Sequence, residues 1–542
     1  MKTESLALGS LLHELAMRSP DGIAVITAEQ RLTFRQMNER VDEAAKALIA
    51  HQVTKGETIS ILDGNTVDWL VIAAAAARIG AVVAPINTWY REREVVWQLN
   101  HADSVLLFAT DGIRGNDYAD TITSLVTNRS LCPKLRSIVS LRHSQLDGTV
   151  PFSTFISKAR NVSDADLSGA AERVEPHDLL FLLYTSGSTM HPRGVRLHNE
   201  SVLQSGRMMA ARFGIVEDDR IWLGTPLFFG FGASNAWPVA WTQAASLVIQ
   251  STFVAEAALE LIQSSEASVF YGFGNIAHAL KSLPGWDPTK VARLRKGPVG
   301  FNRGDKKYLL EDFGLTDGSS MYGMTELYGL AVITEFTDDI AVKLETQGRP
   351  LPGVELRIVD PDTEEELPSG QVGEIRVRGR VTSGYHKEAE LTRNSFDAEG
   401  YIRTGDLASI DANGRLRFVA RLKEMIKVGG INVSPAEVED LLLTHPSIRE
   451  AHVVGIPDGL RDEVIAAFVH STTDISETDV TSFLRERSAS FKTPHYVIFA
   501  TPEEMPRGAT GKIMKRALRE RAIELIRNET AASQNAESDG LR

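Results

Sequence analysis

The chain has 542 residues, which is too long for a single hydrophobic core and predicts two or more domains. With 43% hydrophobic and 24% charged residues, its composition is that of an ordinary globular protein. The net charge of −13, with Lys and Arg scattered along the chain, argues against nucleic acid as the main partner.

The single cysteine, Cys132, excludes an internal disulfide and fits a reducing cytoplasm, where we expect the protein to reside. No catalytic motif surrounds Cys132, so a packed or surface thiol is the simpler interpretation. The N-terminus lacks the charged-then-apolar pattern of a signal peptide. The most apolar early window, residues 69–79, is interrupted by Arg78 and predicts a buried helix rather than a membrane span.

Strand and helix patterns alternate in the first 110 residues, and this alternation predicts a parallel sheet with crossover helices. Helical periodicity marks much of residues 1–55, with apolar positions at Leu11, Leu12, Leu15 and Met17 in its first part. Thr33, followed three residues later by Gln36, predicts a helix start. The remaining predicted elements are a strand at 57–62, a helix at 66–79, a strand at 80–86, and a repeat of the unit at 94–99 and 105–109.

Residues 178–195 join a short apolar run to a loop of small hydroxyl residues around Gly187. A buried strand that ends in such a loop presents backbone N–H groups and hydroxyls to one point, which favours binding of an anion, phosphate above all. The loop lacks the Gly-Lys-Ser/Thr ending of the Walker type. From these residues alone, an ordinary polar loop after a core strand remains an alternative.

After this loop, residues 199–213 predict a helix and 220–223 a strand, followed by two aromatic–glycine clusters at 226–232 and 270–274. Glycine lets a ligand approach the backbone and aromatic rings line apolar cavities, so the clusters are candidates for an apolar pocket. Ordinary core packing explains them equally well.

From residue 353 to about 418 the pattern changes to short alternating strands at 354–359, 372–377 and 416–419, which predicts a small β-rich subdomain. A block of about a hundred residues follows, long enough for a core of its own. We expect an N-terminal domain at 1–420, a hinge at 421–424, a C-terminal domain at 425–528 and a polar, disordered tail at 529–542.

Four stretches in the same order resemble the motifs of the adenylate-forming superfamily, which holds acyl-CoA synthetases, adenylation domains of peptide synthetases and firefly luciferases. They are residues 184–189 with Pro192-Arg193-Gly194-Val195, residues 322–326 (Tyr-Gly-Met-Thr-Glu), 401–406 (Tyr-Ile-Arg-Thr-Gly-Asp) and 506–512 (Pro-Arg-Gly-Ala-Thr-Gly-Lys). One such match would be weak, but four in register across most of the chain argue strongly against coincidence.

The resemblance implies an α/β fold: a large N-terminal domain of doubly wound parallel sheets, a small β-rich subdomain and a small mobile α+β C-terminal domain. It implies an AMP-forming acyl-CoA ligase that joins a carboxylic acid to CoA through an acyl-adenylate, using ATP and Mg²⁺. In this family, Lys512 would bridge the acyl carboxylate and the α-phosphate, and Thr325 would contact that phosphate. Glu326 would hold Mg²⁺, whose preference for hard oxygen ligands suits a carboxylate.

Further residues match the family's nucleotide contacts. Tyr322 would stack on adenine, Asp406 would accept hydrogen bonds from both ribose hydroxyls, and Arg421 would also contact the ribose. The full nucleotide-binding set implied by the resemblance is Thr185, Ser186, Gly187, Ser188, Thr189, Arg193, Gly300, Phe301, Asn302, Tyr322, Gly323, Met324, Asp406 and Arg421.

The family's acyl pocket falls on the two aromatic–glycine clusters, which predict a bulky apolar acid, aromatic or polycyclic. The pocket residues would be Phe229, Phe231, Gly232, Asn235, Phe273 and Gly274. In the second step the C-terminal domain would swing about Lys423, withdraw Lys512, and bring in Gly429 and Gly430. These glycines would line a pantetheine tunnel, because they leave room for a narrow chain.

The chain departs from the family at three places. Met190 stands where the loop normally has Gly or Ser; a left-handed backbone there would cost Met about 1–2 kcal/mol. Losing one phosphate donor would cost about 2.7–4 kcal/mol, or about 10²–10³ in rate. Residues 298–303 keep only Gly300 of a Gly-Gly-Ala-Pro-like turn, and Ala420-Arg421 replaces a Gly-Arg pair.

These departures predict weakened or absent adenylation with retained thioester formation from acyl-AMP and CoA. If adenylation were lost, a separate enzyme would have to supply the adenylate. Alternatives are a stand-alone adenylation enzyme that loads a separate carrier protein, luciferase-type oxidation, and an inactive adenylate-binding scaffold, against which the retained Glu326, Asp406 and Lys512 argue. The expected partners are a small carboxylic acid and CoA, without nucleic acid or a membrane span, and a homodimer is left open.

Overall fold

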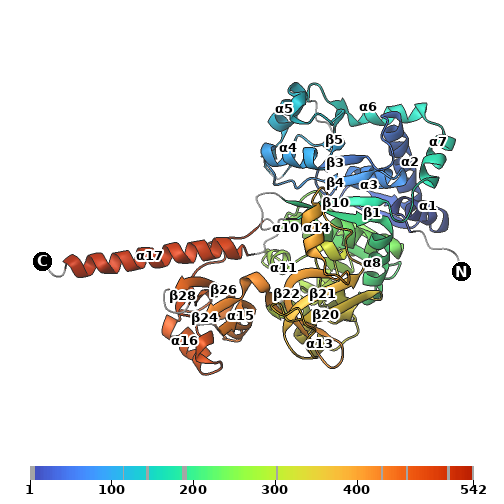
Figure 1. Cartoon of the computed structure of the whole chain (residues 1–542). Coiled ribbons are helices and arrows are strands. Elements are labelled where there is room, and N and C mark those ends of the chain that lie inside the picture. Colours follow the sequence, from blue (N-terminus) through green and yellow to red (C-terminus); the bar gives the residue numbers. More distant parts are fainter. Residues whose placement is uncertain are drawn as a thin grey trace. The chain divides into compact units, whose positions relative to one another are not determined.

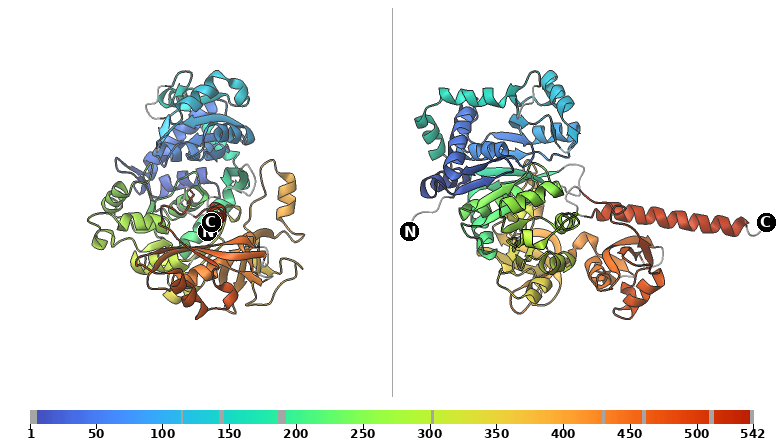
Figure 2. Two further views of the ribbon diagram at one scale, coloured as in Figure 1. Left: turned by 90° about the vertical axis from the view of Figure 1, so that its left-hand side faces the viewer. Right: turned by 180° about the vertical axis from the view of Figure 1, so that it is seen from behind.

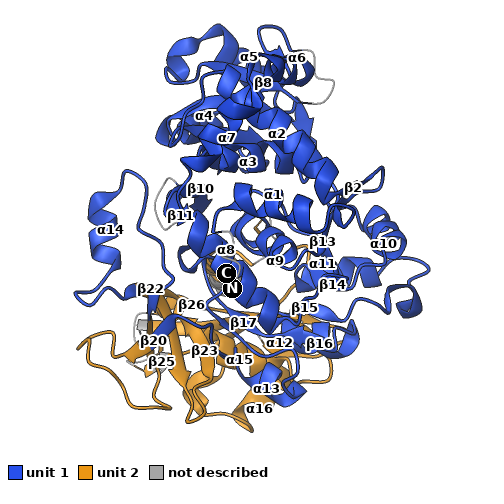
Figure 3. Ribbon diagram, turned by 90° about the vertical axis from the view of Figure 1, so that its right-hand side faces the viewer, with its two compact units in different colours: residues 1–301, 305–356, 377–402 blue, residues 302–304, 357–376, 403–542 orange. Residues whose placement is uncertain are grey.

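The computed structural model describes residues 6–113, 115–141, 146–185, 192–300, 303–428, 431–458, 462–508 and 513–539. The chain forms two compact units, shown in different colours in Figure 3. Unit 1 comprises residues 1–301, 305–356 and 377–402, and unit 2 comprises 302–304, 357–376 and 403–542. Within the described residues, we find no helix with the length and apolar character needed to span a membrane.

Unit 1 contains a seven-stranded sheet around the strand that precedes the predicted anion loop, here called the β10 sheet. All its neighbouring strands are parallel except the antiparallel pair at one edge, β10 and β11. The order is β11 (Arg193–His198), β10 (Leu179–Thr185), β4 (Val82–Pro85), β3 (Thr58–Leu62), β5 (Ser104–Ala109), β8 (Ser137–Ser140) and β9 (Val150–Pro151).

A second seven-stranded sheet of unit 1, here called the β14 sheet, repeats this design. It too is parallel except for one edge pair, β1 and β2. The order is β16 (Asp317–Ser319), β15 (Lys296–Pro298), β14 (Val269–Tyr271), β12 (Arg220–Leu223), β13 (Ser246–Ile249), β1 (Ile23–Ile26) and β2 (Arg31–Thr33).

Helices cover both faces of the β10 sheet (Figures 1 and 2). Side chains of α4 and α5 pack with Leu62 and Leu107 of the sheet, whereas Phe155 of α6 packs edge-on against Phe108, the next residue along the strand. The helices of unit 1 are α1 (Leu8–Arg18), α2 (Phe34–Ala50), α3 (Val67–Arg78), α4 (Glu92–His101), α5 (Ala119–Thr127), α6 (Phe152–Ser157), α7 (Asp164–Glu172), α8 (Asn199–Arg212), α9 (Trp237–Thr242), α10 (Ala255–Ser264), α11 (Gly274–Lys281), α13 (Ile340–Glu345) and α14 (Ala389–Ser395). Helix α12 (Arg303–Lys307) crosses the division between the units.

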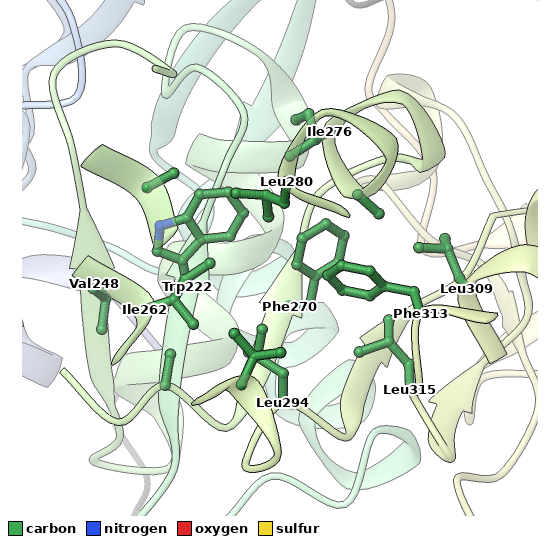
Figure 4. Close-up of a cluster of buried hydrophobic side chains, with 14 of the residues drawn as sticks. Trp222, Val248, Ile262, Phe270, Ile276, Leu280, Leu294, Leu309, Phe313 and Leu315 are labelled. Atoms are coloured by element: carbon green, nitrogen blue, oxygen red, sulfur yellow. The ribbon is translucent and has the colours of Figure 1, made fainter. Parts of the chain in front are cut away.

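One face of the β14 sheet carries a large apolar core, drawn in Figure 4. Trp222 of β12 and Phe270 of β14 stack with ring centroids 5.5 Å apart, and Phe313 packs on Phe270 at 5.1 Å. Leu280 of α11 and Leu309 belong to the same cluster. Burying rings and aliphatic chains of this size stabilises the sheet by about 1.5–3 kcal/mol per side chain, and so holds rigid the strands whose ends carry the candidate pocket.

Asn65 joins the two sheets at the ends of their strands. It follows β3 of the β10 sheet and is buried. Its side chain donates to the Thr225 carbonyl at 2.8 Å and accepts from the Leu227 backbone N–H at 2.7 Å, both just after β12 of the β14 sheet. Ligands of parallel sheets bind beyond the carboxyl ends of strands, so Asn65 fixes the relative position of two candidate binding regions.

Smaller sheets complete unit 1 and continue into unit 2. A three-stranded antiparallel sheet contains β17 (Met321–Tyr322), β18 (Val332–Ile333) and β19 (Arg349–Pro350), and β6 (Gly112–Ile113) pairs with β7 (Asn116–Asp117). A four-stranded sheet, in which β20, β21 and β22 contribute residues to both units, contains β20 (Val354–Val359), β21 (Gly373–Gly379), β22 (Ile402–Ile410) and β23 (Leu416–Arg421).

Unit 2 also contains a five-stranded sheet with apolar side chains on both faces. One face packs on α15 (Pro435–Leu442) and α16 (Glu477–Arg485), and the other packs on the start of α17 (Lys515–Asp539). The strands are β24 (Ile426–Val428), β25 (Ile431–Val433), β26 (Ile448–Asp458), β27 (Asp462–Ser471) and β28 (Tyr496–Phe499).

The fold class predicted from the sequence is confirmed: parallel sheets with helices, and a separate C-terminal region of strands and helices. The capping box of Thr33 and Gln36 starts α2 as predicted. Met17 was expected on the apolar face of α1 but is 75% exposed, whereas Leu11, Leu12 and Leu15 are buried.

Two further differences concern chain segments. Strands β1 and β2 interrupt residues 1–55, for which the sequence predicts helical structure. Helix α17 continues to Asp539, through residues for which the sequence predicted disorder.

Candidate active site

The predicted anion loop is closed by an antiparallel strand pair. Thr185, the last residue of β10, lies directly opposite Arg193, the first residue of β11. The intervening Ser186, Gly187, Ser188, Thr189, Met190 and His191 lie outside the described residues. Because the strand pair returns the chain to its starting point, Arg193 stands beside the base of the loop, where its charge can act on an anion held there.

Among the described residues, one donor of Arg193 has no acceptor. Its Nε is buried and has no hydrogen-bond partner among the described residues. The guanidinium carbon lies 6.0 Å from the centre of the Tyr385 ring, at the outer limit of a cation–π contact. A buried guanidinium N–H without a protein acceptor is uncommon, and an oxygen-rich ligand would satisfy it.

Residues 322–329 form a tight turn that tolerates no side chain at two glycines. A Cβ on Gly323 would lie 1.9 Å from the Gly329 carbonyl oxygen. Gly329 has φ +101°, and a Cβ there would lie 2.1 Å from Nδ2 of Asn235. The turn therefore folds onto itself and onto Asn235, and so presents Tyr322 and Glu326 from one rigid segment.

Glu326 lies in the short 3₁₀ turn η6 (Thr325–Leu327) and is only 7% exposed. Its Oε1 accepts a hydrogen bond from the Tyr385 hydroxyl at 2.9 Å, and its carbonyl accepts from the Thr382 N–H at 2.7 Å. Burial, followed by the charge of Glu326, raises the pKa of Tyr385. The phenol therefore stays protonated and remains a donor to the carboxylate at neutral pH.

These residues fit a magnesium ion that arrives with a nucleotide. We find no group of three or more His, Cys, Asp or Glu side chains in the described part of the chain that could form a protein-only metal site. Mg²⁺ bound to phosphates needs only one or two carboxylates, together with phosphate oxygens and water. The buried Glu326 carboxylate, which accepts a hydrogen bond from the neutral Tyr385 hydroxyl, would supply such a ligand.

Gly300 lies next to the 322–329 turn. It has φ +88°, and its carbonyl accepts the Met321 N–H at 3.3 Å. This contact places Gly300 beside the strand that ends in Tyr322. The next two predicted residues, Phe301 and Asn302, lie outside the described residues.

The predicted acyl-pocket residues form two aromatic groups. The Phe229 ring packs against Trp89 and Phe228, with centroids 5.4 and 4.5 Å away. The Phe231 ring stacks on Phe273 at 4.8 Å and lies 4.7 Å from Tyr271. Phe231 begins a π-helical turn, η3 (Phe231–Ala236), a feature that is frequent at functional sites. Both groups are formed by aromatic rings from separate segments of the chain.

The aromatic segment approaches the candidate catalytic turn through a glycine. A Cβ on Gly230 would lie 3.5 Å from Oγ1 of Thr325, and the Asn235 side chain donates to the Gly230 carbonyl at 2.8 Å. A Cβ on Gly232 would lie 2.7 Å from the Pro226 carbonyl, and one on Gly274 would lie 2.6 Å from a carboxylate oxygen of Asp305. Unit 1 thus places the predicted acyl-pocket segment close to Thr325.

A small cavity of about 20 Å³ lies beside Phe228, at the strand ends that Asn65 joins. Thr225 and Gln250 line it, and Oγ1 of Thr225 and Oε1 of Gln250 are buried without a partner among the described residues. Such a volume admits one water molecule.

In unit 2, Asp406 and Arg421 are directly opposite each other on β22 and β23. Arg421 Nε lies 3.3 Å from Oδ1 of Asp406, which is 4% exposed. Lys423 is exposed in the turn η7 (Leu422–Glu424). The predicted Gly429, Gly430 and Lys512 lie outside the described residues.

Sequence reasoning missed three residues that shape the unit 1 site: Trp89, Tyr271 and Tyr385. Tyr271 belongs to the second aromatic–glycine cluster, so its composition was a usable signal. Trp89 and Tyr385 contact residues far away in the chain, 140 and 59 positions away for Phe229 and Glu326, and no local pattern marks such contacts.

Comparisons with known proteins identify the family of this chain. A model of the AMP-binding enzyme family matches residues 12–386, and a model of the AMP-binding enzyme C-terminal domain matches residues 437–512. A 3-[(3aS,4S,7aS)-7a-methyl-1,5-dioxo-octahydro-1H-inden-4-yl]propanoyl:CoA ligase from Mycobacterium tuberculosis is 33% identical over 530 residues, covering 96% of this chain and 99% of that protein.

Two solved structures share the fold over nearly the whole chain. The anthranilate CoA ligase AuaEII in complex with anthranoyl-AMP aligns with a TM-score of 0.84 at 25% identity, covering 96% of this chain and 98% of that one. ATP-bound MatB from Rhodopseudomonas palustris aligns with a TM-score of 0.82 at 25% identity, covering 95% and 98%. The chain therefore belongs to the AMP-binding enzyme family, the adenylate-forming superfamily that includes the acyl-CoA synthetases.

Proposed function

We propose that this protein is an AMP-forming acyl-CoA ligase that converts a bulky apolar carboxylic acid into its CoA thioester through an acyl-adenylate. The observation that supports this most is the convergence in unit 1 of Arg193, Glu326 and Thr325 with the aromatic segment at Gly230. An anion-binding cation, a buried carboxylate and an apolar pocket are the parts that joining an acid to a nucleotide requires.

The chemistry has two steps. A carboxylate oxygen of the acid attacks the α-phosphorus of ATP, and pyrophosphate leaves. The sulfur of CoA then attacks the acyl carbon, and AMP leaves with the oxygen that it gained. Two anions meet in the first step, so the site must supply positive charge and exclude water.

The roles of the chain's residues follow from this chemistry. Arg193 and Lys512 offset phosphate and carboxylate charge, and Thr325 donates its hydroxyl to the α-phosphate. Glu326 holds Mg²⁺, which neutralises phosphate charge when bound. In unit 2, the carboxylate of Asp406 accepts hydrogen bonds from the ribose hydroxyls. Gly429 and Gly430 line the path of the pantetheine arm of CoA, and Lys423 is the hinge.

The acid is a bulky, ring-bearing one. Phe229, Phe231 and Phe273 supply apolar rings, and the glycines between them leave space beside the backbone. Two relatives support this class through their names: one acts on a bicyclic propanoic acid and the other is an anthranilate ligase. We expect kcat/KM for ring-bearing acids to exceed kcat/KM for acetate by a large factor.

We also propose that adenylation is the weak step, because Met190 replaces the small residue of the anion loop. The two half-reactions can be measured separately with the purified full chain. Thioester formation from preformed acyl-AMP and CoA should run at ordinary ligase rates. Pyrophosphate release from acid and ATP should be about 10²–10³ slower. Equal rates would refute the weakened loop, and absence of thioester from both mixtures would refute the ligase.

A matched variant tests the same point. Met190→Gly restores a residue without a left-handed penalty and should raise pyrophosphate release about 5–30-fold, the equivalent of about 1–2 kcal/mol. The thioester step should be unchanged. If both steps change together, position 190 acts on folding rather than on the phosphates.

Two other functions remain testable beside this one. An enzyme that loads a carrier protein would transfer the acyl group to a phosphopantetheine carrier faster than to CoA. In an inactive scaffold, Lys512→Ala would leave pyrophosphate release unchanged. In a ligase, the same substitution should lower the adenylation rate about 10²–10³-fold. Acceptor competition and pyrophosphate release distinguish these alternatives from the ligase.

A further inference from the structure

Tyr385 connects two parts of the site that are far apart in sequence. Its hydroxyl donates to Oε1 of Glu326 at 2.9 Å, and its ring lies 6.0 Å from the guanidinium carbon of Arg193. The residue is only 8% exposed. One side chain thus contacts both the carboxylate assigned to the metal and the cation beside the anion loop.

The backbone around Tyr385 is fixed to β11, the strand that leaves the anion loop. We call residues 382–386 the strap. Tyr385 forms an isolated antiparallel bridge with Val195, and the His386 N–H donates to the Gly194 carbonyl at 2.8 Å. The Arg196 N–H donates to the Gly384 carbonyl at 3.2 Å. The strap therefore extends the edge of the β10 sheet by a short stretch.

The other end of the strap is fixed to the 322–329 turn. Thr382 donates its backbone N–H to the Glu326 carbonyl at 2.7 Å, and its hydroxyl donates to the Arg196 carbonyl at 2.8 Å. The backbone and the carboxylate of Glu326 are thus both held by strap residues. Displacing β11 would consequently displace the carboxylate.

We propose that Tyr385 is a positioning residue that orients the Glu326 carboxylate for the metal ion accompanying the nucleotide and couples it to Arg193 beside the anion loop. The inference rests on the proposed function, because it assigns a metal–nucleotide to this site. It goes beyond that function, because no motif identified from the sequence includes the strap.

The chemistry of the donor explains why a tyrosine suits this position. A carboxylate has about four lone-pair directions, and a fixed donor restricts its rotation. A neutral phenol orients the carboxylate without cancelling its charge, whereas Lys or Arg in its place would compete with the metal. Partners that orient metal ligands contribute about 10–100-fold to metal affinity or activity.

A purely structural role for Tyr385 makes a different prediction. Tyr385→Phe keeps the ring, its packing and its position near Arg193, and removes only the hydroxyl. If the ring alone matters, this variant should behave as the wild type. If the hydroxyl orients Glu326, the variant should lose metal affinity, and the loss should disappear when Glu326 can no longer bind metal.

The experiment is a double-mutant cycle with a binding readout. Free Mn²⁺ is titrated by electron paramagnetic resonance against the full chain with a non-hydrolysable ATP analogue. Wild type, Tyr385→Phe, Glu326→Gln and the double variant are compared. Each single variant should bind Mn²⁺ about 10–100-fold more weakly than the wild type. The double variant should bind no more weakly than Glu326→Gln, because the two residues act as one unit.

Steady-state kinetics give a second readout. Tyr385→Phe should raise the KM for the metal–nucleotide and leave thioester formation from preformed acyl-AMP unchanged. The matched control is Tyr118→Phe, which removes another buried phenol hydroxyl of unit 1, one that donates to the Thr88 carbonyl. It should leave Mn²⁺ binding as in the wild type, and thermal melting should show that all variants are folded.

Three outcomes are decisive. Wild type that binds no Mn²⁺–nucleotide overturns the proposed function, and this inference with it. Tyr385→Phe that binds within about twofold of a binding wild type overturns the inference alone. Losses that add fully in the double variant also overturn it, because Tyr385 would then act independently of Glu326.

Discussion

Two buried carboxylates, one in each unit, lie beside partner groups of different charge. Glu326 in unit 1 accepts a hydrogen bond from the neutral hydroxyl of Tyr385, whereas Asp406 in unit 2 forms an ion pair with Arg421. The guanidinium is itself 42% exposed, and the tyrosine is buried. The sequence resemblance assigns both carboxylates to the same nucleotide, and it does not distinguish the residues that surround them.

Under the proposed function, this difference matches the ligand proposed for each carboxylate. A neutral donor orients a carboxylate and leaves its charge in place, which favours a metal cation. A guanidinium partner offsets the charge, and the carboxylate can still accept hydrogen bonds from hydroxyl groups such as those of ribose. Neighbouring residues, rather than the carboxylate itself, decide its task.

The largest effect is expected for Glu326→Gln. The amide keeps the shape and loses the charge, so pyrophosphate release from acid and ATP should fall about 10²–10³. Thioester formation from preformed acyl-AMP should stay within a few-fold of the wild type, measured by chromatography of the acyl-CoA. An equal loss in both half-reactions would show that Glu326 maintains the fold and is no metal ligand.

Asp406→Asn should give a smaller effect of a different kind. Losing hydrogen bonds to a charged acceptor costs about 1.5–3 kcal/mol, so the KM for ATP should rise about 10–100-fold while kcat changes little. A steady-state series in ATP at saturating Mg²⁺ measures both constants. A fall in kcat that excess Mg²⁺ rescues would contradict the distinction between the two carboxylates, since that pattern belongs to Glu326.

Phe229→Ala changes an uncharged side chain of unit 1 and so provides a contrast to the two carboxylate variants. Removing this ring should lower kcat/KM for a ring-bearing acid about 10-fold and leave the KM for ATP unchanged, because an apolar contact is worth about 1–3 kcal/mol. The ratio of rates for a ring-bearing and a short acid is the measurement. An unchanged ratio would remove Phe229 from the acyl pocket.

The smallest effect concerns Glu450, a carboxylate in unit 2 with no proposed ligand. Burial alone would raise the pKa of Glu450, but hydrogen bonds and charges from His452 and Arg507 lower it to about 2. A folded-state pKa below the unfolded value stabilises the fold above about pH 4.5, the ordinary value, and this stabilisation is lost as the pH falls towards about 2.

Glu450→Gln should therefore reduce stability at pH 7 by about 1–3 kcal/mol and flatten the pH dependence in that acid window. Urea denaturation of both proteins between pH 2 and 7 provides the check. Parallel stability curves for wild type and variant would contradict the lowered pKa. Activity measured at 25 °C should be unaffected, in contrast to Glu326→Gln and Asp406→Asn.

Local signals in the sequence predicted most of unit 1's framework. The capping pair Thr33 and Gln36 starts α2, and the predicted strand at 220–223 is β12 to the residue. Strand β1 was missed because its four residues gain their pairing from β13, more than 200 positions away. Strand β22 was missed because Gly405, with φ +68°, and its charged neighbours break the alternation.

Candidate site residues could be predicted from sequence where they stand in a motif. They could not be predicted where they depend on contacts between residues far apart in the chain. Tyr322, Glu326 and Asp406 stand in stretches that resemble family motifs, so their positions followed from sequence. The contact of Tyr385 with Glu326 depends on the strap meeting a turn 59 residues earlier, which no periodicity encodes. Trp89 likewise reaches Phe229 only through the docking of the two sheets.

The most direct test of the central claim follows an oxygen atom. A ring-bearing acid labelled with ¹⁸O in both carboxylate oxygens is incubated with the full chain, ATP, Mg²⁺ and CoA, and the products are weighed by mass spectrometry. An acyl-adenylate route predicts AMP that carries one ¹⁸O and an equal amount of acyl-CoA. Acyl-CoA formed with unlabelled AMP, or with ADP in place of AMP, would contradict the account.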